Sequence, residues 1–423
     1  MKKYLFIITT LLLVILPSCK QSSVPRAAVD WQWRGENRDG IYHETGLLKE
    51  WPEEGPQLLW SFEGLGDGYT SVAIANGKLY ITGRDEDNLI LFVFDLNGKL
   101  LTKKTVGKEW DTNFEGPRCS VLVDDGKLYI GNSLGQLFCL DESTLNEIWK
   151  KDGLNDFDGR NIMFGMTENP LIVGDKIFMT LGGETDNMVA LNKHTGELIW
   201  TSPGKGLLST YCSPLYISDQ KIPMVVTWLA ALPVPGTEQG TMNDNEFVAF
   251  HAETGELLWS QTLPSQNTIN PNTPIYSDGL IFVSTGYRGG SWLLRLIDGG
   301  RAVEKVWHNS ADNQHHGPVK VGDYVYTTSH SNSKGFYCID WKTGETRYRE
   351  DHPQIAMVYA DGMLYCYDER GGMSLIKPNP DQFELAGKFQ ITLGTKEHWA
   401  HPVIHDGVLY IRHGDALMAY KLK

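Results

Sequence analysis

The sequence predicts an all-β protein: an eight-bladed β-propeller of four-stranded antiparallel blades, closed by pairing of its N- and C-terminal strands. Two periodic patterns predict this fold. A motif with a tight turn and a final aromatic residue recurs along the chain, most clearly at Ala190–Trp200 and Ala249–Trp259. Eight further turn pairs, from Asn76-Gly77 to Asp406-Gly407, recur roughly every 47 residues, which is the length of one blade.

The recurring motif predicts the outer hairpin of each blade. Its best copy, Ala190–Trp200, contains a Thr-Gly pair that supplies the positive φ of a tight turn between two strands. Cys338–Tyr348 keeps the Thr-Gly pair and an aromatic end, and Cys139–Trp149 keeps the tryptophan but loses the glycine. Weaker copies lie at Phe94–Leu101 and Leu296–Trp307.

The turn pairs predict a second, inner hairpin in each period. Most of them precede an apolar run that contains tyrosine or phenylalanine, as in Lys78–Ile81 and Val408–Ile411. Two hairpins give four strands for each period. No segment has the pattern of a long amphipathic helix.

The two ends of the chain predict how the ring closes. The last period, His401–Lys423, supplies three strands and lacks the final aromatic strand. Residues 57–62 have the form of that strand but precede the first complete period. We therefore expect them to complete the eighth blade, so that no sheet edge is left open.

Residues 1–18 have the pattern of a signal peptide. Lys2 and Lys3 precede an apolar run, Tyr4–Leu16, that is too short to span a membrane. Leu16-Pro17-Ser18-Cys19 resembles the lipobox of bacterial lipoproteins, which implies a lipid on Cys19. Residues 19–30 would then be a lipidated tether, and residues 31–423 the propeller.

This resemblance favours an anchor in the outer membrane, because no aspartate follows Cys19, and we expect the protein on the periplasmic side. The surface-exposed side stays open, and an ordinary secretory signal is the alternative to a lipid anchor.

The formal charge of −14 argues against nucleic acid as a partner, since binding to phosphates requires a basic surface. The five cysteines after Cys19 form no close pair, and their pairing stays open. Of these, Cys139, Cys338 and Cys366 are expected to be buried thiols in strands.

The pattern Ala-x-Asp-x-x-Thr-Gly-x-x-x-Trp resembles the tryptophan-docking repeat of the quinoprotein (PQQ-like) propellers. In that family the tryptophan stacks on the peptide at the glycine of the next blade, which implies docking roles for Trp149, Trp200, Trp259 and Trp307. The family includes PQQ-dependent alcohol dehydrogenases and the propeller lipoprotein of the outer-membrane β-barrel assembly machinery. The opening Trp31–Gly40 also resembles the start of exported PQQ-like repeat proteins.

Residues that lead into the innermost strands should surround one mouth of the central channel. We expect a ligand-binding funnel there, formed by Arg118, Glu168, Asn169, Tyr211, Asn272, His316, Trp399 and His401. These groups suit a polar small molecule, a carbohydrate or an envelope protein. His315-His316 indicates a metal only weakly, because adjacent residues of a strand point to opposite faces, and no metal site is expected. The loop Trp228–Asn245 is expected to lie over the same mouth.

Two classes of function are compatible with this pattern. A PQQ-dependent alcohol or sugar dehydrogenase would, by resemblance, need a stacking tryptophan, a calcium site, a base and often a vicinal disulfide. Trp399, Glu168 and Asn169 could supply part of this set, but the chain has no adjacent cysteines and no evident aspartate base.

We therefore expect a non-catalytic, exported, lipid-anchored monomer that acts as a binding or assembly platform, without catalytic residues or cofactor. A dehydrogenase with PQQ and calcium, and a carbohydrate-binding or carbohydrate-active propeller, are the alternatives.

Overall fold

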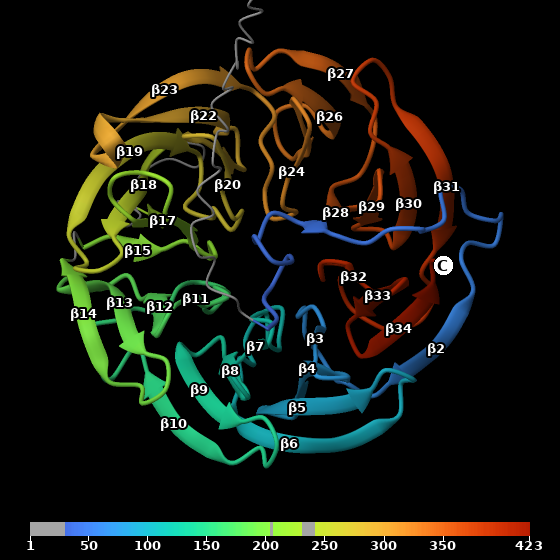
Figure 1. Cartoon of the computed structure of the whole chain (residues 1–423), viewed down its shortest axis with the longest axis horizontal. Coiled ribbons are helices and arrows are strands. Elements are labelled where there is room, and N and C mark those ends of the chain that lie inside the picture. The colour runs from blue at the N-terminus through green and yellow to red at the C-terminus, as the bar shows by residue number, and fades with distance from the viewer. Residues whose placement is uncertain (1–29, 204–205, 231–241) are drawn as a thin grey trace, which may run out of the picture.

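The computed structural model describes residues 30–203, 206–230 and 242–423, which form a ring of eight mainly antiparallel sheets around a common axis (Figure 1). This confirms the predicted eight-bladed propeller. Within the described part, the helical structure is a single 3-10 turn, η1 (Asp298–Gly300), and no helix there is long and apolar enough to cross a membrane. The expected signal peptide, Cys19 and most of the tether lie outside the described residues.

The first four blades follow one another along the chain, each from an inner to an outer strand. Blade 1 contains β3 (Ala73–Ala75), β4 (Lys78–Asp85), β5 (Asn88–Asp95) and β6 (Leu100–Lys108). Blade 2 contains β7 (Leu122–Asp124), β8 (Lys127–Gly131), β9 (Gln136–Asp141) and β10 (Glu147–Asp152). Blade 3 contains β11 (Leu171–Val173), β12 (Lys176–Thr180), β13 (Asp186–Asn192) and β14 (Leu198–Pro203). Blade 4 contains β16 (Leu215–Ile217), β17 (Met224–Ala230), β18 (Asn243–His251) and β19 (Leu257–Ser265), and β15 (Leu208–Ser209) also pairs with β17.

The remaining blades keep this order until the last, which takes its outer strand from the other end of the chain. Blade 5 contains β20 (Ile275–Ser277), β21 (Leu280–Thr285), β22 (Gly290–Ile297) and β23 (Ala302–Asn309). Blade 6 contains β24 (Val319–Val321), β25 (Tyr324–Ser329), β26 (Gly335–Asp340) and β27 (Thr346–Glu350). Blade 7 contains β28 (Ile355–Ala360), β29 (Met363–Asp368), β30 (Gly372–Lys377) and β31 (Glu384–Gln390). Blade 8 contains β32 (Val403–His405), β33 (Val408–His413), β34 (Ala416–Lys421) and β2 (Leu58–Glu63).

Closure of the ring depends on β2. This strand runs antiparallel to β34, with Trp60 opposite Ala419 and Glu63 opposite Ala416. The predicted pairing of the N- and C-terminal strands is therefore confirmed. Since β2 covers the edge of β34, backbone groups that would otherwise be open to pairing with another chain are satisfied within the ring.

Three of the tryptophans with expected docking roles share one arrangement between neighbouring blades. Each indole lies against a glycine in the outer turn of the next blade, and its Nε1 donates to a carbonyl oxygen three residues before that glycine. The pairs are Trp149 with Gly196 and Lys193, Trp200 with Gly255 and Ala252, and Trp307 with Gly344 and Trp341. A Cβ on these glycines would lie 2.5–2.8 Å from the nearest indole atom, so no other residue fits without movement.

The remaining blade contacts vary this arrangement. Trp60 of β2 lies against Gly98 of blade 1, but its Nε1 donates to Leu96, two residues before that glycine; the repeat motif did not reveal this contact. Trp259 is buried between blades 4 and 5, but its Nε1 has no hydrogen-bond partner. Tyr348 stacks on Phe336 within blade 6.

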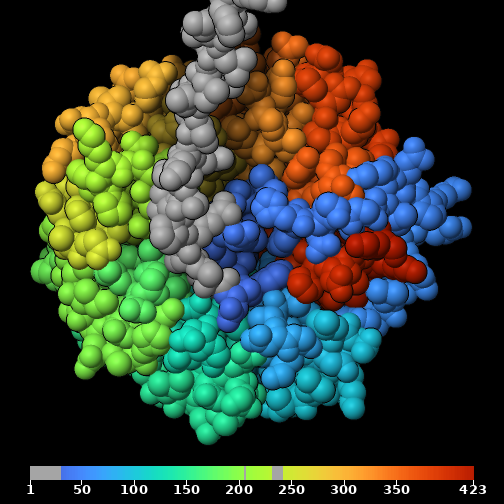
Figure 2. Space-filling model, viewed as in Figure 1, coloured from blue at the N-terminus to red at the C-terminus, as the bar shows by residue number. Residues whose placement is uncertain are grey.

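The N-terminal segment crosses the centre of the face shown in Figure 2. Hydrogen bonds of Asp30 with Asp125 and of Leu47 with Asp361 place it on the face of the Asp-Gly turns. Trp31 pairs through its backbone with Val123 of blade 2, and β1 (Ile41–Tyr42) then pairs in parallel with β28 of blade 7. Trp51 packs against Tyr365 and Phe389 farther out. The sequence pattern did not predict this crossing, which ties opposite sides of the ring together.

Two substitutions can separate the contribution of the indole contact to stability from that of the positive φ of glycine. Gly255 and Gly77 have φ values of +74° and +72°, but only Gly255 would place a Cβ against an indole. We expect Gly77→Ala to lower the free energy of unfolding by about 1–2 kcal/mol, the cost of a left-handed alanine. Gly255→Ala should cost about 1–3 kcal/mol more because of the clash with Trp200. Urea denaturation measures both, and equal losses would show that the indole contact contributes nothing.

Closure by β2 can be tested by two truncations. A chain that begins at Gln57 keeps β2, and a chain that begins at Gly64 loses it. We expect the first to remain monomeric, with a lowered melting temperature because Trp51 and its neighbours are missing. The second should aggregate through the exposed edge of β34. Light scattering and sedimentation distinguish them, and a monomeric second chain that melts like the first would contradict closure by this strand.

Candidate binding funnel

Two buried arginines from the N-terminal segment close the channel from the side of the Asp-Gly turns. Arg34 is 3% exposed and donates to the carbonyl oxygen of Pro318 at 2.8 Å, while its Nη1 lies 3.1 Å from Nδ1 of His401. Arg38 is 2% exposed and donates to the carbonyl oxygens of Pro170 and Asn169 at 2.9 and 2.5 Å. These carbonyls belong to blades 3 and 6, so the segment is held at the centre of the ring.

The charges of both arginines are met mainly by backbone dipoles. Burial lowers the pKa of Arg34 and of Arg38 to about 10, so both stay protonated at neutral pH. Burial also raises the pKa of the nearby Glu168 carboxyl to about 8. The carbonyl oxygens around the guanidinium groups therefore provide most of the stabilisation that water gives to an exposed arginine.

A cavity of about 340 Å³ opens at the opposite mouth of the channel. Its wall comes from the segments between blades and from the N-terminal segment. The lining residues are Trp33, Tyr69, Phe114, Arg118, Phe164, Thr167, Asn169, Tyr211, Ser213, Ile269, Pro271, Tyr287, Gln314, His315 and Trp399. Trp33 is contributed by the segment that closes the channel from the other side.

Aromatic rings in contact with one another form much of the cavity wall. The ring of Trp399 lies 5.1 Å from that of Tyr69 and 4.9 Å from that of Phe114, measured between centroids. Phe164 continues this arrangement, 5.8 Å from Phe114 and 6.2 Å from Tyr211. These tilted arrangements leave ring surfaces available to an occupant of the cavity.

Most polar side chains of the wall are already hydrogen-bonded within the protein. Arg118 donates to the carbonyl oxygens of Asn113 and Phe114, and burial lowers its pKa. Asn169 donates to Ser213 and accepts from the backbone of Ser120. In addition, Gln314 donates to the hydroxyl of Tyr287, and the hydroxyl of Tyr69 donates to Glu397. Recognition in this cavity therefore depends more on ring surfaces than on free hydrogen-bonding groups.

The eight expected funnel residues divide into two groups. Arg118, Asn169, Tyr211 and Trp399 line the cavity. Glu168, Asn272, His316 and His401 lie outside its lining.

The second group has contacts behind the wall. Glu168 accepts a hydrogen bond from the backbone of Thr180 and lines a separate cavity of about 30 Å³. Asn272 donates to the carbonyl oxygen of Asn313. His401 contacts Arg34 and Trp33, and burial lowers its pKa well below the usual value, with the charge of Arg34 acting in the same direction.

Sequence reasoning missed four aromatic residues of the wall, Trp33, Phe114, Phe164 and Tyr287. Phe114 and Phe164 lie in long connections between blades, where no periodicity shows which side chains turn inward. Trp33 lies in a segment that precedes the first repeat. Its only signal was the unusual richness in tryptophan and arginine of the opening Trp31–Gly40.

His315 and His316 do not point to opposite sides, contrary to the expectation for adjacent residues of a strand. They lie in a bend before β24, their ring centroids are 3.9 Å apart, and Gly317 follows with φ of +46°. His315 also packs edge-on against Trp399 at 5.3 Å. Burial lowers the pKa of His315 to about 3 and that of His316 well below its usual value.

Most of the expected loop Trp228–Asn245 lies outside the described residues. Its two ends belong to strands: Trp228 is fully buried in β17, and Asn245 is buried in β18.

The described wall of the cavity does not fit a PQQ and calcium centre. Calcium requires several oxygen ligands that include carboxylates, and none of the residues that line the cavity is aspartate or glutamate. The cysteines offer no vicinal disulfide, since Cys119, Cys139, Cys212, Cys338 and Cys366 are free and buried.

The role of the buried arginines can be tested with a matched pair of variants. Arg34→Met keeps the length of the side chain but leaves several buried carbonyl oxygens without a donor, which should cost about 1–3 kcal/mol or more in free energy of unfolding. Arg295 pairs with Glu304 on the surface, so Arg295→Met should cost less than about 1 kcal/mol. Urea denaturation measures both. Equal stabilities would show that Arg34 does not hold the segment in the channel.

A family model described as "Outer membrane protein assembly factor BamB" matches residues 93–350, more than half of the chain. The curated outer membrane protein assembly factor BamB of Shewanella oneidensis is 22% identical over 295 residues, covering 61% of this chain and 65% of that protein. Quinoprotein alcohol dehydrogenase PedH of Pseudomonas putida is 26% identical over 181 residues, covering 42% of this chain and 28% of that protein.

Among solved structures, BamB from Moraxella catarrhalis superimposes with a TM-score of 0.60 at 14% identity, covering 87% of this chain and 98% of that one. This similarity concerns the fold. The chain matches less than a third of the length of PedH. These matches confirm the predicted resemblance to the PQQ-like propellers, and the chain belongs to the family described as outer membrane protein assembly factor BamB.

Proposed function

We propose that this protein is a non-catalytic binding platform of the cell envelope, and that its funnel accepts an apolar or aromatic segment of an envelope protein. It acts as a monomer, anchored through a lipid on Cys19 at the periplasmic face of the outer membrane, and it does not bind nucleic acid. Membership of the BamB family supports an assembly role.

The composition of the cavity wall carries this proposal. The ring surfaces of Phe114, Phe164, Tyr211 and Trp399 are available, whereas Arg118 and Asn169 already use their donors within the protein. An apolar side chain gains from leaving water for such a cavity and needs few hydrogen bonds there. A polar ligand would lose hydrogen bonds with water and find few replacements in the wall.

Apolar residues at the mouth support a protein partner. Phe114 is 39% exposed and Met163 is 73% exposed. The side chain of Asn113 donates to the carbonyl oxygen of Met163, which brings the two segments together. Aromatic residues and methionine are enriched in protein interfaces, and exposed ones beside a cavity are typical of a binding surface.

The position of Asp30 supports a particular orientation of the protein relative to the membrane. Its carboxylate accepts a hydrogen bond from the backbone of Asp125, in an Asp-Gly turn on the face opposite the funnel. A lipid on Cys19, eleven residues earlier in the sequence, would therefore hold the protein by that face and direct the funnel away from the membrane.

The proposal can be tested by photo-cross-linking in the bacterium that makes the protein. Benzoylphenylalanine in place of Phe114 puts a reactive ring of similar shape at the mouth of the funnel. Benzoylphenylalanine in place of Leu198 provides the control on the outer rim, because Leu198 is 49% exposed on β14. We expect a cross-link to an envelope protein from position 114 only, abolished by Trp399→Ala and identified by mass spectrometry.

Three other outcomes would contradict the proposal. Cross-links from position 198 alone would place the working surface on the outer blades. Saturable binding of an oligosaccharide in the funnel, lost in Trp399→Ala and without any protein cross-link, would favour the carbohydrate alternative. Dye-linked oxidation of an alcohol after addition of PQQ and calcium would establish a dehydrogenase.

A further inference from the structure

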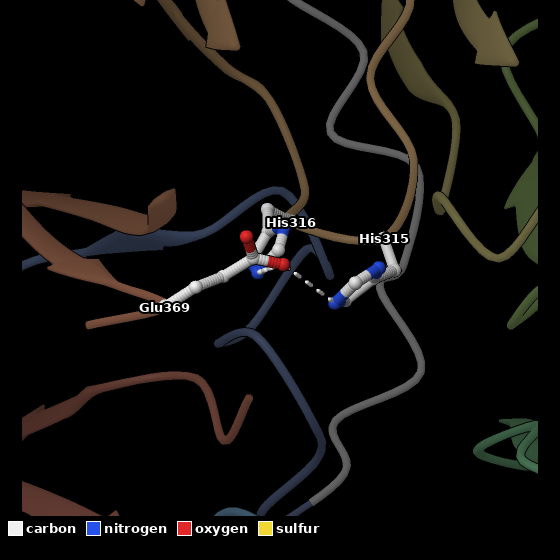
Figure 3. Close-up of side chains that lie close together, drawn as sticks. All are labelled: His315, His316 and Glu369. Atoms are coloured by element: carbon white, nitrogen blue, oxygen red, sulfur yellow. Dashed lines mark ion pairs between the residues drawn. The ribbon is translucent and has the colours of Figure 1, made fainter. Parts of the chain in front are cut away.

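Three side chains from neighbouring blades converge at the edge of the funnel (Figure 3). His315 and His316 precede β24 of blade 6, and Glu369 follows β29 of blade 7. Oε1 of Glu369 lies 3.8 Å from Nε2 of His315 and 3.7 Å from Nε2 of His316. One potential ligand atom of each residue lies within 4.8 Å of the other two.

The histidines lack the hydrogen bonds that buried imidazoles normally make. His316 is fully buried, and neither of its ring nitrogens makes a hydrogen bond of ordinary geometry, although the side chain of Gln354 lies close enough to interact with the ring. Nε2 of His315 is also buried without a partner. Buried polar groups of folded proteins are nearly always satisfied, so unpaired nitrogens at one place indicate that a partner outside the chain occupies the space between them.

The separations suit a shared metal ion better than direct hydrogen bonds. Distances of 3.7 and 3.8 Å from nitrogen to oxygen are too long for hydrogen bonds. Ligand atoms about 2.0–2.2 Å from one zinc ion lie about 3.3–3.6 Å apart at tetrahedral to trigonal angles. The two separations from nitrogen to oxygen would have to contract by a few tenths of an ångström. The two histidine nitrogens lie within 4.8 Å of each other, and rotation of their side chains would have to bring them together around the ion.

We propose that His315, His316 and Glu369 bind one divalent transition-metal ion of the zinc type at the edge of the funnel. Two imidazoles and one carboxylate form a donor set that such ions prefer, whereas calcium and magnesium prefer oxygen ligands alone. The site differs from a calcium centre inside the cavity both in its ligands and in its place.

Neighbouring residues hold Glu369 and the bend that carries the two histidines. Nε2 of Gln354 lies 3.4 Å from Oε1 of Glu369, and the backbone of Glu369 donates to the carbonyl oxygen of Gln354. The backbone of His316 donates to Oδ1 of Asn313, which fixes the bend. Arg34, the cation beside Gly317, is engaged by carbonyl oxygens and by His401. Such partners hold metal ligands in place before the ion binds.

The ion would link blade 6 to blade 7 and fix a side chain of the funnel wall. Of the three ligands, His315 alone is among the residues that line the cavity, and its ring contacts Trp399. The site thus sets the position of a funnel residue without depending on what the funnel binds.

Metal content tests the inference directly. The purified full-length protein, stripped with a chelator and then dialysed against Zn²⁺, should retain about one zinc ion per chain by mass spectrometry, since the three ligands form one site. Co²⁺ in its place should give the visible absorption of a four- or five-coordinate ion. His316→Ala and Glu369→Gln should each weaken zinc binding at least about 100-fold, because each removes a ligand.

A control variant and a second measurement separate binding from folding. His43 is an exposed histidine away from the cluster, and His43→Ala should bind zinc like the unaltered protein. Zinc should raise the melting temperature of the unaltered protein and of His43→Ala, but not that of Glu369→Gln, a change at a partly exposed residue that should remain folded. Retention of zinc by both ligand variants, or no retention of Zn²⁺ or Co²⁺ by the unaltered protein, would overturn the proposal.

Discussion

The contact between a tryptophan and a glycine of the next blade sets the geometry of the ring. Where Trp149, Trp200 and Trp307 lie against a glycine, the indole comes closer to the backbone than any side chain would allow. The hydrogen bond from Nε1 then fixes the rotation of the ring as well as its distance. At the junctions that carry it, this contact places one blade relative to the next, so the width of the channel and the convergence of the inner strands depend on it.

Repetition explains why the fold could be predicted from the sequence. One blade buries its faces only against two neighbours, so most repeats carry a similar turn, glycine and aromatic. Copies as distant as Ala190–Trp200 and Cys338–Tyr348 therefore reinforce one another. Closure was also predictable, because residues 57–62 resemble an outer strand and the last repeat lacks one. The crossing of the channel by Trp31–Gly40 was not, since that segment has no second copy with which to compare it.

The site was less predictable for a related reason. Topology indicates which residues approach the channel, but a one-residue bend decides whether a side chain faces the cavity or the space behind it. Asn169 faces the cavity, whereas the preceding Glu168 faces a separate small one. A bend has the opposite effect at His315 and His316, whose rings lie side by side where the alternation of a strand would have separated them. Such bends depend on contacts between distant segments, so they cannot be predicted from local sequence patterns.

The N-terminal segment both fills the centre of the ring and forms part of the funnel wall. Arg34 and Arg38 bring two charges into a buried channel, a cost that is offset because the residues just before two inner strands present carbonyl oxygens there. The neighbouring Trp33 then becomes part of the wall of the funnel. The cavity is therefore complete only when the segment is seated, which couples the shape of the binding surface to the integrity of blades 3, 6 and 7.

The pairing of β2 with β34 also determines how the molecule can fail. Trp60 must find Ala419, close to the other end of the 423-residue chain, so β2 waits until nearly all blades have been synthesised. Contacts of such long sequence separation form slowly, because the entropy of closing the loop must be lost before the strand is gained. During that interval the open edge of one chain can accept β2 of a second chain, with the same hydrogen bonds and the same register. The strand that closes the ring is thus the position at which this propeller is open to domain swapping.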